Sequence, residues 1–182
     1  MNLLKNSIYF LFSFLLLTPS MGFSQNQESR DSLNIELTNA AREIMTAAGT
    51  CALITLDEEG RPRARAMAPF LPENDFTVWF GTNSNSRKVN QIKNDSRVTL
   101  YYLDADASGY VMIQGEAELV NDNKEKEKRW KNEWEAFYPN RPEGYLLIKV
   151  TPKWMEVSSN KRGVISDSVT WQPATLHFNS KQ

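Results

Sequence analysis

Short runs of apolar or alternating residues, separated by turn-forming residues, fill this chain from residue 50 to residue 158. They predict strands at 50–56, 61–69, 76–81, 97–103, 109–120, 144–151 and 153–158. The turns between them are rich in aspartate and glycine. Strands at this spacing, with few helices, favour a mainly β fold, a closed antiparallel barrel. No internal repeat is visible, so we expect a single domain over 32–160.

Two helices are predicted around this barrel. An amphipathic helix begins at Ser32 and closes at Gly49, and its apolar stripe is expected to pack on the barrel. A second helix runs from about Ser86 to Asp95. We expect a flexible leader at 25–31 and a tail at 161–182 that packs on the barrel.

The start of the chain has the pattern of a secretory signal peptide, predicted to cover 1–24. Lys5 supplies a positive charge, 8–17 an apolar run, and 22–24 a small-x-small site before Gln25. The apolar run is shorter than the roughly 20 residues that span a membrane. We therefore expect an exported protein, periplasmic or secreted, without stable membrane insertion after cleavage. An uncleaved membrane anchor is the alternative.

Export bears on any cofactor. Because the positive region lacks paired arginines, the route is expected to thread unfolded chains, so a flavin must be captured outside the cytoplasm. Removal of 1–24 takes away one positive charge, Lys5, and leaves the mature chain slightly acidic. That balance gives no reason to expect nucleic acid as a partner.

The segment 82–88 places hydroxyls, amides and two cations where a strand passes into a helix. Arg87 and Lys88 fall in the first helical turn, where the helix dipole disfavours positive charge. A bound anion would reverse that penalty, because the Ser86 hydroxyl, the free N–H groups and both cations could share one phosphate. The alternative is an ordinary capped helix with two solvated cations.

A third cation comes from the strand 61–69. Alternation places Arg61, Arg63, Arg65 and Met67 on one face of this strand. Arg61 lies beside the turn and is expected to be exposed. Arg65 lies deeper, where a guanidinium can bind phosphate through two hydrogen bonds.

The order of these motifs from Cys51 to Val120 resembles the FMN-binding split barrel of pyridoxamine 5'-phosphate oxidase and its relatives, especially the general-stress-protein branch. The resemblance runs through the hairpin 52–60, the arginine strand, Thr-Asn-x-x-Ser-Arg-Lys at 82–88, and the strands 97–102 and 111–117. It implies a split β-barrel of six or seven antiparallel strands with peripheral helices. It also implies a homodimer with the flavin site at the interface.

The resemblance implies particular site residues as well. Arg65, Arg87 and Lys88 correspond to the family's phosphate-binding cations, with Ser86 completing the phosphate's hydrogen bonds. The other implied cofactor-binding residues contact the flavin ring through their backbone or line its ribityl and phosphate end: Ala66, Met67, Gly81 and Thr82.

The chain also departs from the oxidase. Phe70 stands where the oxidase has a lysine, and Tyr110 where it has a flavin-contacting glutamine. The oxidase's C-terminal arginine and histidine set has no clear counterpart. These departures imply flavin binding without the vitamin B6 activity.

Side-chain catalysis is not expected. Cys51 can form no internal disulfide and is predicted to be a buried, inert thiol. His177 is the single histidine and is expected to be a surface or packing residue, so no metal site is predicted. The run 123–129 alternates in charge and is expected to be a solvated helix face leading to Trp130 and Trp134. These two tryptophans are expected in the core, with a substrate cleft as the alternative.

These observations leave two main functions. One is an FMN-dependent oxidoreductase acting on an unidentified small molecule. The other is a non-catalytic protein that binds flavin, haem or another anionic ligand, with a stress-related role. A barrel that has lost its ligand and serves as an interaction module is a third possibility, against which the three phosphate-site cations argue.

Overall fold

The structure is a computed structural model that describes residues 21–138 and 140–178. Most of the predicted signal peptide, 1–20, lies outside these residues. Within the described part of the chain, no helix is long and apolar enough to cross a membrane.

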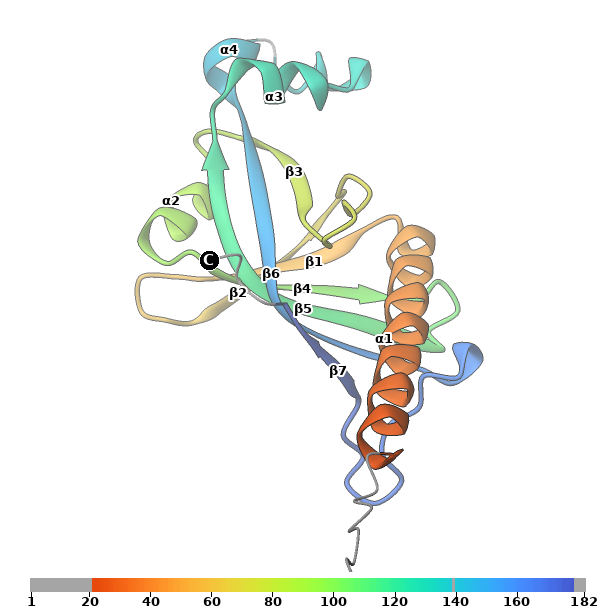
Figure 1. The fold of residues 1–182 in the computed structure, drawn as a ribbon. Helices are drawn as coiled ribbons and strands as arrows, with labels where there is room; N and C mark the ends of the chain where they lie inside the picture. The colour runs from red at the N-terminus through yellow and green to blue at the C-terminus, as the bar shows by residue number, and fades with distance from the viewer. Residues whose placement is uncertain (1–20, 139, 179–182) are drawn as a thin grey trace, which may run out of the picture.

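The strands form one antiparallel sheet that curls into a barrel (Figure 1). The sheet order is β2-β1-β4-β5-β6-β3, with β7 also paired to β6. The strands have these bounds: β1 Cys51–Leu56, β2 Pro62–Met67, β3 Val78–Asn83, β4 Arg97–Leu103, β5 Gly109–Val120, β6 Tyr145–Ser159 and β7 Ala174–His177. The mainly β split-barrel fold expected from the sequence is confirmed. Because β2 and β3 end the sheet without pairing to each other, the barrel is split between them.

The predicted strands 144–151 and 153–158 are in fact one strand, β6. Pro152 lies between the two predicted ranges, and proline cannot donate a hydrogen bond to a sheet. In the structure the pairing of β5 with β6 shifts register between Gln114 and Gly115, opposite Trp154 and Pro152. Proline is tolerated at such a bulge, so β6 continues through it.

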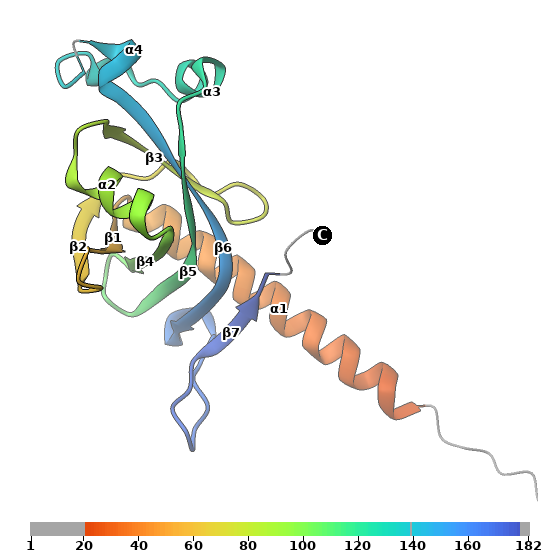
Figure 2. The same cartoon turned by 90° about the vertical axis from the view of Figure 1, so that its left-hand side faces the viewer.

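The longest helix, α1, extends over Met21–Ala48 and begins well before Ser32. The segment 25–31, expected as a flexible leader, is therefore helical in this structure. Residues 23–48 contain no glycine or proline that would stop the helix. Gly49 then adopts a left-handed φ of 63° and ends it, as predicted. Figure 2 shows the first half of α1 projecting beyond the barrel.

The other helices are short: α2 Arg87–Asn94, α3 Asn123–Lys128 and α4 Arg141–Gly144. The short helices lie against different strands of the sheet. α2 contacts β1 and β5, whereas α3 and α4 lie at the far end of β6 (Figure 1). The described chain thus carries α2 beside the barrel wall, where its first turn faces strand side chains.

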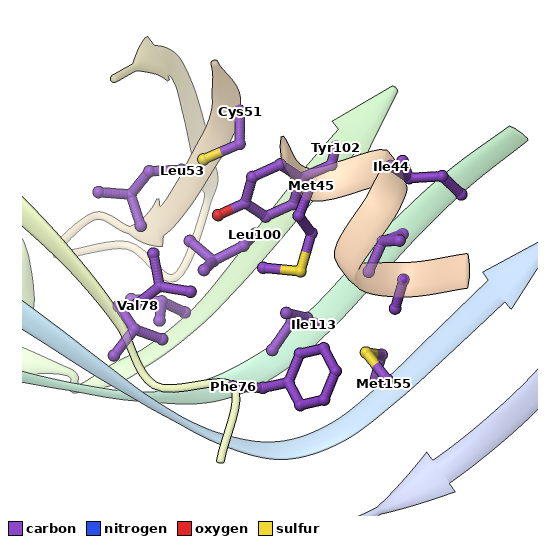
Figure 3. Packing of buried hydrophobic residues seen from close by; sticks show 14 of the residues in the cluster. Ile44, Met45, Cys51, Leu53, Phe76, Val78, Leu100, Tyr102, Ile113 and Met155 are labelled. Carbon is purple, nitrogen blue, oxygen red and sulfur yellow. The ribbon is translucent and has the colours of Figure 1, made fainter. Parts of the chain in front are cut away.

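The core joins the second half of α1 to the inner faces of the strands (Figure 3). Leu37, Ile44 and Met45 of α1 are buried against side chains such as Phe76 and Ile113. Cys51 is buried in the same core, where burial raises the pKa of its thiol to about 12. The thiol therefore stays protonated near neutral pH, which fits the inert role expected for it.

The end of the chain adds β7, which the sequence did not predict as a strand. β7 pairs with residues 154–157 of β6, and the Phe178 ring lies 5.8 Å from the Phe76 ring, centroid to centroid. His177 lies in β7 with an exposed side chain. The segment 174–178 thus packs on the barrel as part of the sheet.

The bulge generates a prediction about Gly115. An added Cβ there would lie 2.4 Å from the Thr151 carbonyl oxygen, a rigid backbone atom. We expect Gly115→Ala to lower the free energy of unfolding by about 1–3 kcal/mol, the usual cost of an overpacked core. Urea denaturation measures this. The matched control is Gly144→Ala, since a Cβ at Gly144 meets no atom within 4 Å. Equal stability of the two variants would contradict the prediction.

Candidate functional site

The start of α2 presents polar groups that its own side chains do not satisfy. Ser86 is the N-cap residue, but its hydroxyl makes no capping hydrogen bond. Instead Ser86 Oγ lies 3.1 Å from Thr82 Oγ1, which also accepts a hydrogen bond of 3.0 Å from Lys88 Nζ. The Val89 N–H donates to the Ser86 carbonyl oxygen at 2.9 Å. Because no side chain caps the first turn, the N–H groups of Arg87 and Lys88 are available to an external acceptor.

Arg65 on β2 points toward α2 and is held there by three acceptors. Its guanidinium donates to the Leu53 carbonyl oxygen at 3.1 Å, to Thr55 Oγ1 at 2.7 Å and to Gln91 Oε1 at 2.9 Å. Thr55 belongs to β1 and Gln91 to α2, so Arg65 links two strands to the helix. Its position is therefore fixed before any ligand arrives.

Burial and repulsion between cations disfavour the charged forms of Arg65 and Lys88. Burial, followed by repulsion from Arg87, lowers the pKa of Arg65. Burial, followed by repulsion from Arg65, lowers the pKa of Lys88. In the described chain none of these three side chains forms an ion pair with a carboxylate. The cluster thus carries positive charge that the protein itself does not neutralise.

Two neighbouring arginines, Arg61 and Arg63, have carboxylate partners, unlike Arg65. Arg61 pairs with Asp57 at 3.0 Å and with Glu59 at 2.5 Å, and Arg63 pairs with Asp57 at 2.8 Å. The hairpin therefore neutralises its outer arginines and leaves Arg65 without a carboxylate. We call the group of Arg65, Thr82, Ser86, Arg87 and Lys88 the anion cradle.

The remaining predicted site residues lie in two places. Ala66 is exposed and Met67 half-buried on β2, and among the described strands only β1 pairs with β2. Its outer backbone groups are therefore free to bind a ligand. Gly81 is not part of the anion cradle, because a Cβ there would lie 2.5 Å from the Trp134 ring. Gly81 and Thr82 face opposite sides of β3, as neighbouring residues in a strand do.

Sequence reasoning missed Thr55 and Gln91, which orient Arg65. Gln91 follows Arg87 by one helical turn and so shares its side of α2. Thr55 is a fully buried polar residue at an inward-facing position of an otherwise apolar strand. The four-residue spacing of Arg87 and Gln91, and a polar residue within an apolar strand, were visible in the sequence. The pairing of β1 with β2, which brings Arg65 to them, is a tertiary fact.

An aromatic cluster covers the other side of Gly81. The rings of Trp130, Trp134, Tyr138 and Tyr145 contact one another at centroid distances between 5.2 and 6.2 Å. The two tryptophans are half-buried, and they lie beyond the end of α3 rather than on one helix.

The charged run 123–129 was expected to be a solvated helix face. The structure differs, because two of its cations are buried. Lys126 and Arg129 are buried, with exposed fractions of 4% and 7%. Arg129 lies 3.7 Å from the Trp79 ring centroid and pairs with Glu73 and Glu125. An aromatic face and two carboxylates thus draw this cation inward.

Tyr110, one of the departures from the oxidase pattern, has a structural partner. Its hydroxyl donates to Glu156 Oε1 at 2.9 Å, and its ring stacks on Tyr101 at 5.4 Å. Among the described residues, no group of three or more histidine, cysteine, aspartate or glutamate side chains could hold a metal ion.

The fold and the anion cradle together define a split-barrel protein with a cluster of cations without carboxylate partners at the start of α2. Residues 36–177 match the model of a family described as pyridoxamine 5'-phosphate oxidase like. The chain belongs to that family, as the order of its motifs suggested. Proteins of this family commonly bind flavin. The chain matches no curated protein.

Solved structures agree on the fold. General stress protein 26 from Bacillus anthracis shares 23% identity over 80% of this chain and 98% of its own, with a TM-score of 0.59. A protein related to general stress protein 26 from Clostridium acetobutylicum shares 22% identity over 81% and 94%, with a TM-score of 0.62. A heme binding protein from Mycobacterium smegmatis shares 14% identity over 67% and 53%, with a TM-score of 0.54. These likenesses show a common fold.

The un-neutralised charge generates a prediction that needs no cofactor. We expect inorganic phosphate to raise the unfolding temperature of the protein, because an anion that binds the folded state alone stabilises it. Arg87→Ala should shrink this rise and should change stability without phosphate by no more than about 0.5 kcal/mol, the scale of surface substitutions. Thermal unfolding across a phosphate series measures both. Arg61→Ala, which removes a carboxylate-paired arginine, is the control and should keep most of the rise. An undiminished response in Arg87→Ala would contradict the assignment.

Proposed function

We propose that this protein is an FMN-binding oxidoreductase that acts on a small molecule. The observation that carries the proposal is the anion cradle, in which three cations without carboxylate partners surround an uncapped helix start. A terminal phosphate fits this arrangement. It would accept hydrogen bonds from the first-turn N–H groups of α2 and from the Ser86 hydroxyl.

The neighbouring strand suits the flavin ring system. Among the described strands β2 pairs only with β1, so its other edge is open. The small side chains of Ala64 and Ala66 leave room for a flat ring system on their face of the strand. Backbone groups of Ala66 and Met67 would orient the ring beside this edge. When bound, FMN would supply hydride or electron transfer, while the protein supplies binding, orientation and the surrounding field.

The cradle residues have separable roles in this proposal. Arg65 is already fixed by Thr55 and Gln91, so it would offer its charge without a conformational cost. Lys88 is tied to Thr82 and would add a second charge from α2. Arg87 is exposed and would close over the phosphate from the solvent side.

A non-catalytic ligand-binding role is the second candidate. The heme binding protein among the structural neighbours favours it, because that protein shares this fold and heme is a large anionic ligand. Haem carries two carboxylates, which the same cations could bind. The two functions differ in whether the bound ligand turns over.

The proposal predicts saturable FMN binding by the chain 25–182, near one FMN per subunit, seen in the visible absorption spectrum. We expect Arg87→Ala to weaken FMN binding by about 1.5–3 kcal/mol, the scale of a charge-assisted hydrogen bond. Arg61→Ala is the matched control and should bind with nearly unchanged affinity. Unchanged FMN affinity in Arg87→Ala would refute the phosphate site.

The same preparation separates the two functions. Rapid reoxidation of the reduced, bound flavin by an added acceptor supports an oxidoreductase. Tight binding without turnover, or preference for haem over FMN, supports the non-catalytic role.

We further propose that two copies of the chain pack together at the outer face of the barrel. A groove of about 360 Å³ lies over β1, β4, β5 and β6, with an apolar floor that includes Ile54, Leu56 and Trp154. Arg97, which pairs with Asp95, and the Lys153–Glu116 pair lie at the same groove, so charges of both signs border its apolar floor and suit a self-complementary contact. The family resemblance also implies a homodimer, with the flavin site at its interface.

Sedimentation of the purified protein tests the dimer. We expect a dimer at micromolar concentration, and Leu56→Glu should shift it toward monomer, because the new charge would be buried without a partner. Glu58→Gln, an exposed change in the neighbouring turn, is the control. A wild-type monomer at all accessible concentrations would overturn this part of the proposal.

A further inference from the structure

A separate cavity lies where the end of α1 meets the segment that follows β2. Its volume is about 220 Å³. It shares no residue with the anion cradle. Its lining is largely apolar and comes from α1, the 69–72 segment, β4 and the stretch after α3: Met45, Thr46, Gly49, Pro69, Phe70, Leu71, Pro72, Tyr102 and Lys131.

Lys131 brings a positive charge to this cavity. Its Nζ lies 5.0 Å from the Phe70 ring centroid and 5.2 Å from the Trp134 ring centroid. Across residues 21–138 and 140–178 it forms no ion pair with a carboxylate. Ring faces attract an ammonium group without cancelling its charge. The charge therefore remains available to an anion that enters the cavity.

The 69–72 segment holds its shape without a ligand. The Phe70 N–H donates to the Trp79 carbonyl at 2.8 Å, and the Glu73 N–H donates to the Thr77 carbonyl at 2.9 Å. Pro69 and Pro72 restrict the backbone between these bonds. Leu71 is consequently held with 68% of its surface exposed, although an apolar side chain gains by burial. A ligand in the cavity could cover part of it.

Tyr102, which lines the inner side of the cavity, carries an unusual polar group. The Tyr102 hydroxyl is buried and is the one such side-chain atom in the described chain without a hydrogen-bond partner. Its polar neighbour is the Cys51 thiol, which Figure 3 shows beside it. The ring of Tyr102, together with Met45, gives the cavity a deformable apolar wall on this side.

We propose that this cavity binds a small amphipathic carboxylate, with its apolar body against Met45, Phe70 and Tyr102 and its carboxylate at Lys131. The volume lies below the range of drug-sized ligand pockets, roughly 300–1,000 Å³, so the ligand is about the size of a single ring with one acidic group. The proposal does not depend on FMN binding, because the cavity and the anion cradle have no lining residue in common.

Benzoate is the probe, and its uncharged analogue benzamide tests the charge. In the mature chain, 25–182, we expect saturable benzoate binding by calorimetry, with shifts of the Met45 methyl signal in NMR spectra. Benzamide should bind at least about tenfold more weakly, the factor that corresponds to loss of one charge-assisted contact. Absence of saturable benzoate binding, or equal binding of benzamide, would overturn the proposal.

Variants locate the site. Lys131→Gln should weaken benzoate binding about tenfold, whereas Lys124→Gln, an exposed lysine of α3, should not. Thr46→Phe fills the mouth of the cavity from an exposed helix position and should abolish binding while the fold is kept. Arg87→Ala should leave benzoate affinity unchanged.

Two outcomes would overturn the location. If Arg87→Ala weakens benzoate binding as much as Lys131→Gln, benzoate occupies the anion cradle instead. If Thr46→Phe binds benzoate as well as the wild-type protein does, the ligand lies elsewhere. Retention of FMN binding by Lys131→Gln and Thr46→Phe would show that any loss is confined to this cavity.

Discussion

Positive charge held in place without a carboxylate is the constraint on which the rest of this molecule depends. Arg65 is fixed by acceptors that are neutral: a backbone carbonyl, a threonine and a glutamine. Neutral acceptors orient a guanidinium and leave its charge uncancelled, whereas a carboxylate would do both. The barrel has to bring β1, β2 and α2 together to supply these acceptors. A bound anion would offset the unfavourable electrostatic energy of this uncancelled positive charge.

Much of the fold could be predicted because its signals are local. The period-two strands β1, β2, β4 and β5 and the start of α2 follow from residues that are adjacent in sequence. β7 could not be predicted, because its four residues gain stability only by pairing with β6. Pro152 misled for the same reason, since the bulge that accommodates it depends on the partner strand. The early start of α1 reflects an absence of helix-breaking residues, which is a weak signal.

The candidate site divides in the same way. Arg87 and Lys88 were predictable because charge in the first turn of a helix is a local anomaly. The sequence could not show which strand arginines pair with carboxylates. That depends on how the hairpin folds around Asp57, which pairs with Arg61 and Arg63. Gly81 was assigned to the same site as Thr82, yet consecutive strand residues face opposite sides, and Trp134 occupies the side of Gly81. The burial of Arg129 also depends on a partner distant in sequence, Trp79.

The position of β7 has a consequence for how the chain is made. One edge of β6 pairs with β3 over residues 145–150 and with β7 over residues 154–157. β7 follows β6 in the chain, so this stretch of β6 stays unpaired until β7 has left the ribosome. An open strand edge recruits other strands, including those of a second nascent chain. A chain truncated before Ala174 would therefore be prone to aggregation, even though its barrel core and anion cradle would be intact.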